Sequence, residues 1–108
     1  MITESIFAWA QKTPEKTAVI YNERSWSYRS FAEHIAIARG YFLRQGYAGP
    51  GYAVLATYNR MDFWSLSLAL RSLGLTTIAV GSAAMLSELK LPDIRCVVIR
   101  KGEVWPDL

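Results

Sequence analysis

The sequence predicts an α/β fold in which an N-terminal helix and a β-hairpin precede alternating helices and a mainly parallel sheet. Three short β-branched or apolar runs, at 53–57, 76–80 and 95–99, alternate with segments of helical periodicity. Such alternation is typical of parallel strands joined by helical crossovers. Because 108 residues fit one small domain, we expect residues 1–108 to form a single α/β subdomain.

The first helix is expected to begin at a Thr3 cap and to end before Pro14. A threonine hydroxyl can accept from a free amide of the first turn. The residue that precedes a proline disfavours helical geometry. The prediction is therefore a helix of about ten residues at the N-terminus.

A β-hairpin is predicted next. Residues 17–21 are rich in β-branched and aromatic side chains, which favours a strand. Asn22 and Glu23 form a plausible two-residue turn because Asn tolerates positive φ, although Glu is unusual at the second position. Residues 24–26 are expected to pair back onto the first strand.

Ser27 is expected to cap the second helix, which runs to about Gln45 and ends at Gly46. One face of this helix carries apolar side chains at i, i+4, i+7 and i+11, namely Phe31, Ile35, Ala38 and Phe42. Asn59 is expected to cap the third helix, and Gly74 to end it. Apolar residues cover most of its surface, which predicts burial between layers. A short helix is expected at 83–89.

Composition excludes some classes of function. The net charge is +3, from 12 basic and 9 acidic side chains, and no basic run interleaves with aromatics, so nucleic-acid binding is not expected. The longest uncharged, mostly apolar helical stretch, 63–70, is far short of the roughly 20 residues that span a bilayer. No secretory signal is visible. The expectation is a soluble cytoplasmic protein without a membrane span.

Few residues are candidates for chemistry. His34 lies in the middle of a helix and is expected to be partly exposed; with one His and one Cys, no common metal cluster can form. Cys96 is expected to be a small core residue. Trp9, Trp26 and Trp64 are expected to pack in the core. No nucleotide-binding glycine motif is present.

The turn at 57–60 is the most interesting strand-to-helix turn, because α/β proteins place ligands at the carboxyl ends of parallel strands. Asn59 could hold a ligand and Arg60 could pair with a phosphate. The simpler interpretation, a helix cap and a surface arginine, is preferred. We therefore assign no catalytic, cofactor-binding or metal-binding residue from the sequence.

Three segments together carry a resemblance. They are 13–19 (TPEKTAV), 26–31 (WSYRSF), and 59–74 with Asn59, Asp62-Phe63, Ala69-Leu70 and Gly74. In this order and spacing they resemble the opening of the adenylate-forming enzymes, which include acyl-CoA synthetases and peptide-synthetase adenylation domains. The resemblance covers about 13–99. The family's glycine–aspartate pair before the second strand is Gly51-Tyr52 here, and the proline that the family usually places in the segment matching 78–82 is missing.

The resemblance implies that the chemistry lies beyond residue 108. The family's Ser/Thr/Gly-rich loop ending in Pro-Lys, its Thr-Glu motif, its ribose-binding aspartate and its C-terminal lysine are not in this sequence. The resemblance thus implies ATP and Mg²⁺ for the intact enzyme, with CoA or a carrier thiol as acceptor, and no cofactor for this chain.

Two functions are carried forward. The first is the N-terminal scaffold of an AMP-forming acid–thiol ligase, inactive by itself, whose partner is the remainder of the adenylate-forming domain. The alternative is a stand-alone, non-catalytic interaction or dimerisation module derived from that family. In either case we expect the chain to self-associate, because 108 residues supply few layers to cover the apolar third helix, including Trp64 and Leu68.

Overall fold

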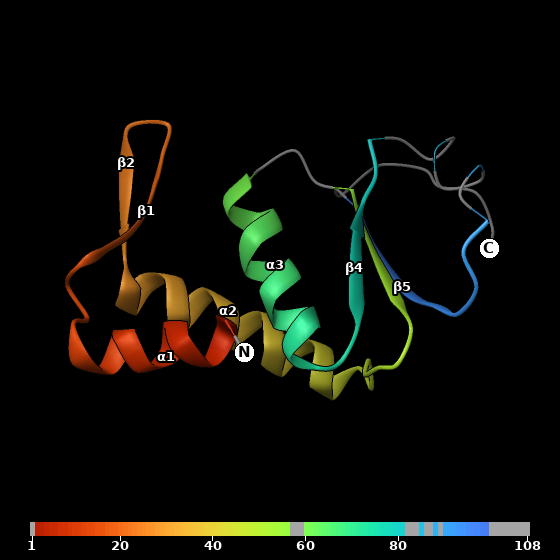
Figure 1. Ribbon diagram of the computed structural model, residues 1–108, viewed down its shortest axis with the longest axis horizontal. Coiled ribbons are helices and arrows are strands. Elements are labelled where there is room, and N and C mark those ends of the chain that lie inside the picture. The colour runs from red at the N-terminus through yellow and green to blue at the C-terminus, as the bar shows by residue number, and fades with distance from the viewer. Residues whose placement is uncertain (1, 57–59, 82–84, 86–87, 89, 100–108) are drawn as a thin grey trace.

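The computed structural model describes residues 2–56, 60–81, 85, 88 and 90–99. The elements are α1 (Ile2–Lys12), β1 (Thr17–Tyr21), β2 (Arg24–Ser27), α2 (Tyr28–Arg44), β3 (Tyr52–Ala56), α3 (Arg60–Ser72), β4 (Thr76–Ala79) and β5 (Ile94–Ile99). Figure 1 shows the β1–β2 hairpin and the β3–β4–β5 sheet on opposite sides of α3. α2 runs along the lower end of both, and α1 lies against α2 on the side of the hairpin. The predicted α/β fold is confirmed.

The hairpin forms where the sequence predicts it. β1 and β2 pair antiparallel, with Tyr21 opposite Arg24. Asn22 and Glu23 both adopt positive φ, 50° and 62°, which is the backbone of a tight turn that matches the twist of the two strands. The ring of Tyr21 meets that of Trp64 edge-on at 6.3 Å, so the hairpin leans against α3.

α1 ends at Lys12, as expected before the proline. The predicted cap at Thr3 is wrong, because the helix already includes Ile2 and Thr3 lies within its first turn. The Thr3 side chain is 1% exposed, and its hydroxyl donates to the carbonyl oxygen of Leu68 at 3.3 Å. Thr3 therefore fastens α1 to α3.

α2 agrees with the prediction at both ends. Ser27 precedes the helix in extended conformation, and its Oγ accepts from the amide of Ser30 at 3.1 Å. Phe31, Ile35 and Phe42 are buried in the main core. Gly46 follows the helix with φ 82°, a conformation that glycine adopts without strain.

The three-stranded sheet has the order β4-β3-β5, and both pairings are parallel. The strands lie within one residue of the predicted ranges at each described end. The central strand β3 is buried on both faces. Ala53 and Leu55 face the helices in the main core, and Val54 and Ala56 belong to a smaller cluster on the opposite face. The continuous apolar run at 53–56 reflects this double burial.

α3 lies between the hairpin and the sheet, as predicted, and part of its apolar surface is left uncovered. Ala69 and Leu70 are fully buried, whereas Trp64 and Leu68 are only partly buried. The expected cap, Asn59, lies outside the described residues. So does most of the helix expected at 83–89, although Met85 and Glu88 have helical backbone. Among the described helices, none is long and apolar enough to cross a membrane.

Candidate functional site

The turn singled out in the sequence follows the carboxyl end of β3. Residues 57–59 lie outside the described part of the chain, as does the side chain of Arg60, although Arg60 begins α3. The ligand-binding interpretation of Asn59 and Arg60 therefore stays a prediction, as does the simpler one of a cap and a surface arginine.

His34 is an exposed helix residue with local contacts, as predicted. Its Nδ1 lies 2.7 Å from the carbonyl oxygen of Ser30, one turn earlier in α2. Its ring meets Trp26 edge-on at 5.0 Å, and the guanidinium of Arg24 lies over the same indole at 4.4 Å. His34 thus helps to hold the hairpin against α2. No base or nucleophile is paired with it among the described residues.

The described part of the chain contains neither a reactive cysteine nor a group of metal-binding side chains. Cys96 is partly buried and packs against the main core, and burial raises the pKa of its thiol. A raised pKa keeps the thiol protonated, which makes it a weak nucleophile. No group of three His, Cys, Asp or Glu side chains that could hold a metal ion occurs among the described residues.

Trp9 is the tryptophan that departs from the prediction. Trp26 and Trp64 pack against the core as expected, but Trp9 is 46% exposed. The ammonium groups of Lys12 and Lys16 lie 5.9 and 5.7 Å from the centre of its ring. Trp9 therefore covers the outer side of α1 with cation–π contacts instead of filling the interior.

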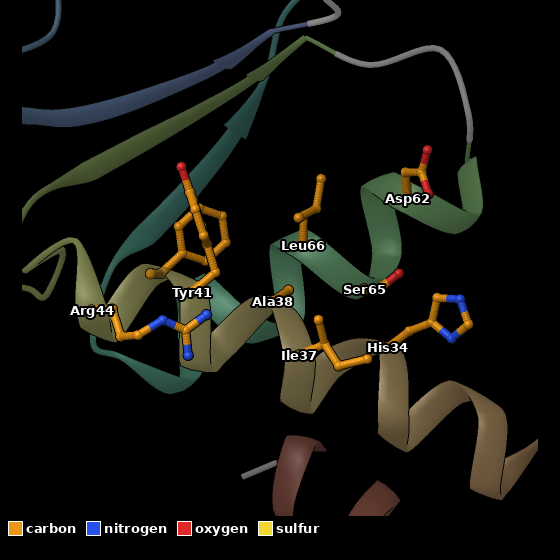
Figure 2. A pocket seen from close by; sticks show the side chains of 9 residues that line it. His34, Ile37, Ala38, Tyr41, Arg44, Asp62, Ser65 and Leu66 are labelled. Carbon is orange, nitrogen blue, oxygen red and sulfur yellow. The ribbon is translucent and has the colours of Figure 1, made fainter.

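Two hollows of the described surface are mainly apolar. A cleft of about 550 Å³ lies between the hairpin and α3, with the exposed Ile20 at its rim and Phe31 and Leu68 among its lining residues. A groove of about 480 Å³ runs between α2 and α3. Figure 2 shows Ile37, Tyr41 and Leu66 along this groove, with Arg44 at one end and His34 and Asp62 at the other.

The exposed apolar side chains of α2 were missed by the sequence analysis. Ile37 is 72% and Tyr41 51% exposed, although both lie in a helix whose other face is buried. They are four residues apart, so they form a second apolar stripe. That spacing is the signal that could have located the groove from the sequence.

The sheet also has two open edges. Among the described strands β3 pairs on both sides, whereas β4 and β5 each pair on one side only. β5 is six residues long, and Arg95 is its one charged residue. An unpaired apolar edge of this kind accepts a further strand readily, and proteins normally cover it. The architecture of the described residues is therefore that of a sheet that can be extended.

Comparison with solved structures identifies the class of protein that has this fold. The chain superposes on NpsA-ThdA, an artificially fused adenylation–PCP di-domain NRPS from Klebsiella oxytoca, with a TM-score of 0.82 at 16% identity, covering 98% of this chain and 21% of that one. For the NpsA N-terminal subdomain from Klebsiella oxytoca, the TM-score is 0.81 at 16% identity, with 98% and 29% covered.

A second group of similar structures consists of CoA synthetases. The o-succinylbenzoate CoA synthetase MenE of Bacillus subtilis, in complex with AMP, has a TM-score of 0.77 at 16% identity, with 92% of this chain and 27% of that chain covered. No protein-family model matches the sequence, and no curated protein matches it significantly. The chain thus shares its fold with part of these adenylation and CoA synthetase structures, and it spans less than a third of their length.

Proposed function

We propose that residues 1–108 are the N-terminal scaffold subdomain of an AMP-forming acid–thiol ligase. Such an enzyme converts a carboxylic acid and ATP, with Mg²⁺, into an acyl-adenylate and passes the acyl group to CoA or a carrier thiol. The observation that carries the proposal is the likeness of fold over 98% of the chain, with a TM-score of 0.82. The ordered segments 13–19, 26–31 and 59–74 add independent support from sequence.

The proposed role of this chain is to support the rest of the domain. The open edges of β4 and β5 offer backbone donors and acceptors to further strands. Val54 and Ala56, on the sheet face that points away from α3, are already buried, so we propose that the remainder of the domain joins this chain mainly at the sheet edges. A scaffold of this kind positions a substrate pocket through its packing, without contributing the reacting groups.

ATP and Mg²⁺ are assigned to the remainder of the proposed enzyme. Adenylation needs cationic or amide groups around a pentavalent phosphorus, and a metal on the phosphates. The described residues contain no group of side chains suited to a metal ion, and each of the two hollows is lined by a single arginine, Arg44 in one and Arg71 in the other. We therefore propose that the groups that bind ATP and Mg²⁺ belong to the remainder of the domain.

The isolated 108-residue chain is expected to be catalytically silent. Purified protein should show no ATP–pyrophosphate exchange above a no-enzyme blank with any member of a panel of aryl and alkyl carboxylic acids. Isothermal titration should detect no saturable ATP binding. Reproducible exchange that is lost in an Arg60→Ala variant would contradict the proposal, because it would place phosphate chemistry at the 57–60 turn.

The alternative, a stand-alone interaction module, has one specific observation in its favour. The exposed stripe of Ile37 and Tyr41 lies on a helix, where every backbone group of the helix interior is already paired, so it cannot be a site for a further strand. A side-chain interface is the use that fits it. The stripe of Ile37 and Tyr41 would bind a partner through side chains, whereas the sheet edges would bind one through backbone hydrogen bonds.

A further inference from the structure

We infer that the remainder of the proposed domain adds a strand to β5, not to β4, and that it also covers the α2–α3 groove. This inference rests on the proposed function and deepens it, because that function does not decide which edge of the sheet is extended. It is supported by the open edge of β5, by the polar side chains at β4, and by an apolar surface that leads from β5 to the groove.

The unpaired side of β5 is apolar. The strand has six residues and is therefore about 20 Å long. Its one charged residue, Arg95, donates a hydrogen bond from Nε to the carbonyl oxygen of Pro50 at 3.1 Å. An added Cβ at Gly51 would meet the Cγ of Arg95 at 2.7 Å, so this side chain lies over the start of β3. The charge is thus held away from the side on which a further strand would pair.

The edge at β4 differs in length and in polarity. β4 has only four residues. The Oγ1 of Thr77 accepts a hydrogen bond from the Nε of Arg71 at 3.0 Å and lies 3.0 Å from the Oγ of Ser67. Short edge strands and charged side chains beside them are devices by which proteins prevent the addition of a strand. β4 therefore has the features of a finished edge, and β5 does not.

An apolar surface connects the β5 edge to the α2–α3 groove. A hollow of about 340 Å³ beside β5 is lined by Cys96–Ile99 together with side chains of α2 and α3. Tyr41, Phe42 and Leu66 line both this hollow and the groove. Figure 2 shows the side chains of Tyr41 and Leu66 pointing from the helices towards the strands. The hollow and the groove are thus one continuous surface, which reaches as far as Ile37, 72% exposed.

A strand added to β5 would lie beside this surface. Alternate side chains of a strand point to opposite faces of the sheet, so those on the face of the helices would reach the hollow. The structures that share this fold continue well beyond it, since this chain covers 21% and 29% of two of them. The expected occupant is therefore a strand with apolar side chains towards the helices, joined to an apolar segment that packs over Ile37 and Tyr41.

The test measures maleimide labelling of single cysteine substitutions in the full-length native protein, with each position read by peptide mass spectrometry. Ile37→Cys reports on the groove and Ile99→Cys on β5. The matched controls are Ile20→Cys, at a position 70% exposed on the hairpin, and Thr76→Cys, at an exposed position of β4. Each rate is divided by the rate for the same variant in urea, and circular dichroism checks that each variant is folded.

Ile37→Cys and Ile99→Cys should react at least about tenfold more slowly than Ile20→Cys, because a covered thiol reacts only when the contact opens. Thr76→Cys should react about as fast as Ile20→Cys. Fast labelling at either position 37 or position 99 would overturn the inference, and so would slow labelling at position 76. Protection that is lost on roughly tenfold dilution would also overturn it, since a second copy would then be the cover.

ATP–pyrophosphate exchange by the same preparation separates this inference from the proposed function. Exchange together with fast labelling of Ile37→Cys would contradict the inference and leave the ligase function standing. Slow labelling at positions 37 and 99 without exchange would support the interface and contradict the ligase function. A reading frame that stops after codon 108 would overturn both.

Discussion

Replacing Ile35 by alanine is expected to lower the free energy of unfolding by about 2–5 kcal/mol. Ile35 is 0% exposed and is among the largest side chains with no exposed surface. It lies in the core cluster that joins the helices to the inner face of β3. Removing it loses the transfer free energy of the side chain and leaves a cavity that rigid neighbours fill only in part.

The loss is large compared with the total, since small domains are stable by only about 5–15 kcal/mol. Urea unfolding, followed by tryptophan fluorescence at 1 μM, would measure it. Ile37→Ala is the matched control on the same helix: at 72% exposure it should change the free energy by no more than about 0.5 kcal/mol. Equal effects at the two positions would mean that α2 does not present Ile35 to the core.

Replacing Gly49 by alanine is expected to cost about 1–3 kcal/mol or more, through steric conflict in the loop before β3. A Cβ added at Gly49 would meet the carbonyl oxygen of Gly74 at 1.9 Å and its carbonyl carbon at 2.3 Å. Both are backbone atoms, so neither can rotate away. The necessary shift would also strain the hydrogen bond that the Gly49 amide donates to the carbonyl oxygen of Leu73 at 2.9 Å.

Gly40→Ala is the control for this substitution and should raise the free energy of unfolding instead of lowering it. Gly40 lies within α2, and an added Cβ would find its nearest neighbour, an Arg44 guanidinium nitrogen, at 3.4 Å. Alanine in a helix interior is favoured over glycine by roughly 0.5–1 kcal/mol. In thermal melts, the melting temperature of Gly40→Ala should therefore be higher than that of the unmodified chain, and that of Gly49→Ala should be several degrees lower. A Gly49→Ala variant as stable as the unmodified chain would contradict the close approach.

Most of the local structure could be predicted because its signals are local. The β1–β2 hairpin follows from a β-branched run and a turn of two residues, and α2 follows from the Ser27 cap and one apolar periodicity. The errors occur where a side chain has a tertiary role. Thr3 could cap a helix, but its hydroxyl instead reaches α3. Trp9 has a large aromatic side chain of the kind that usually fills a core, but it lies on the outer side of α1 and is 46% exposed.

The candidate site was less accessible to sequence reasoning. Hydrophobicity marks Ile37 and Tyr41 as apolar, but it does not say that the buried face of α2 is already complete with Phe31, Ile35 and Phe42. Whether a second stripe is covered depends on where α3 lies, and that is a property of the assembled fold. Whether reactive side chains meet in space also depends on the assembled fold, and none do so among the described residues.

The central claim is that this chain is the opening part of an acid-activating enzyme. The most direct test is acid-dependent ATP–pyrophosphate exchange by the native protein, purified from its source with an antibody raised against residues 1–108. We expect a protein several times larger than 12.2 kDa, since the chain spans only 29% of the NpsA subdomain, and exchange that requires one class of carboxylic acid. A native protein that ends after codon 108, or a longer one that shows no exchange with any acid, would contradict the claim.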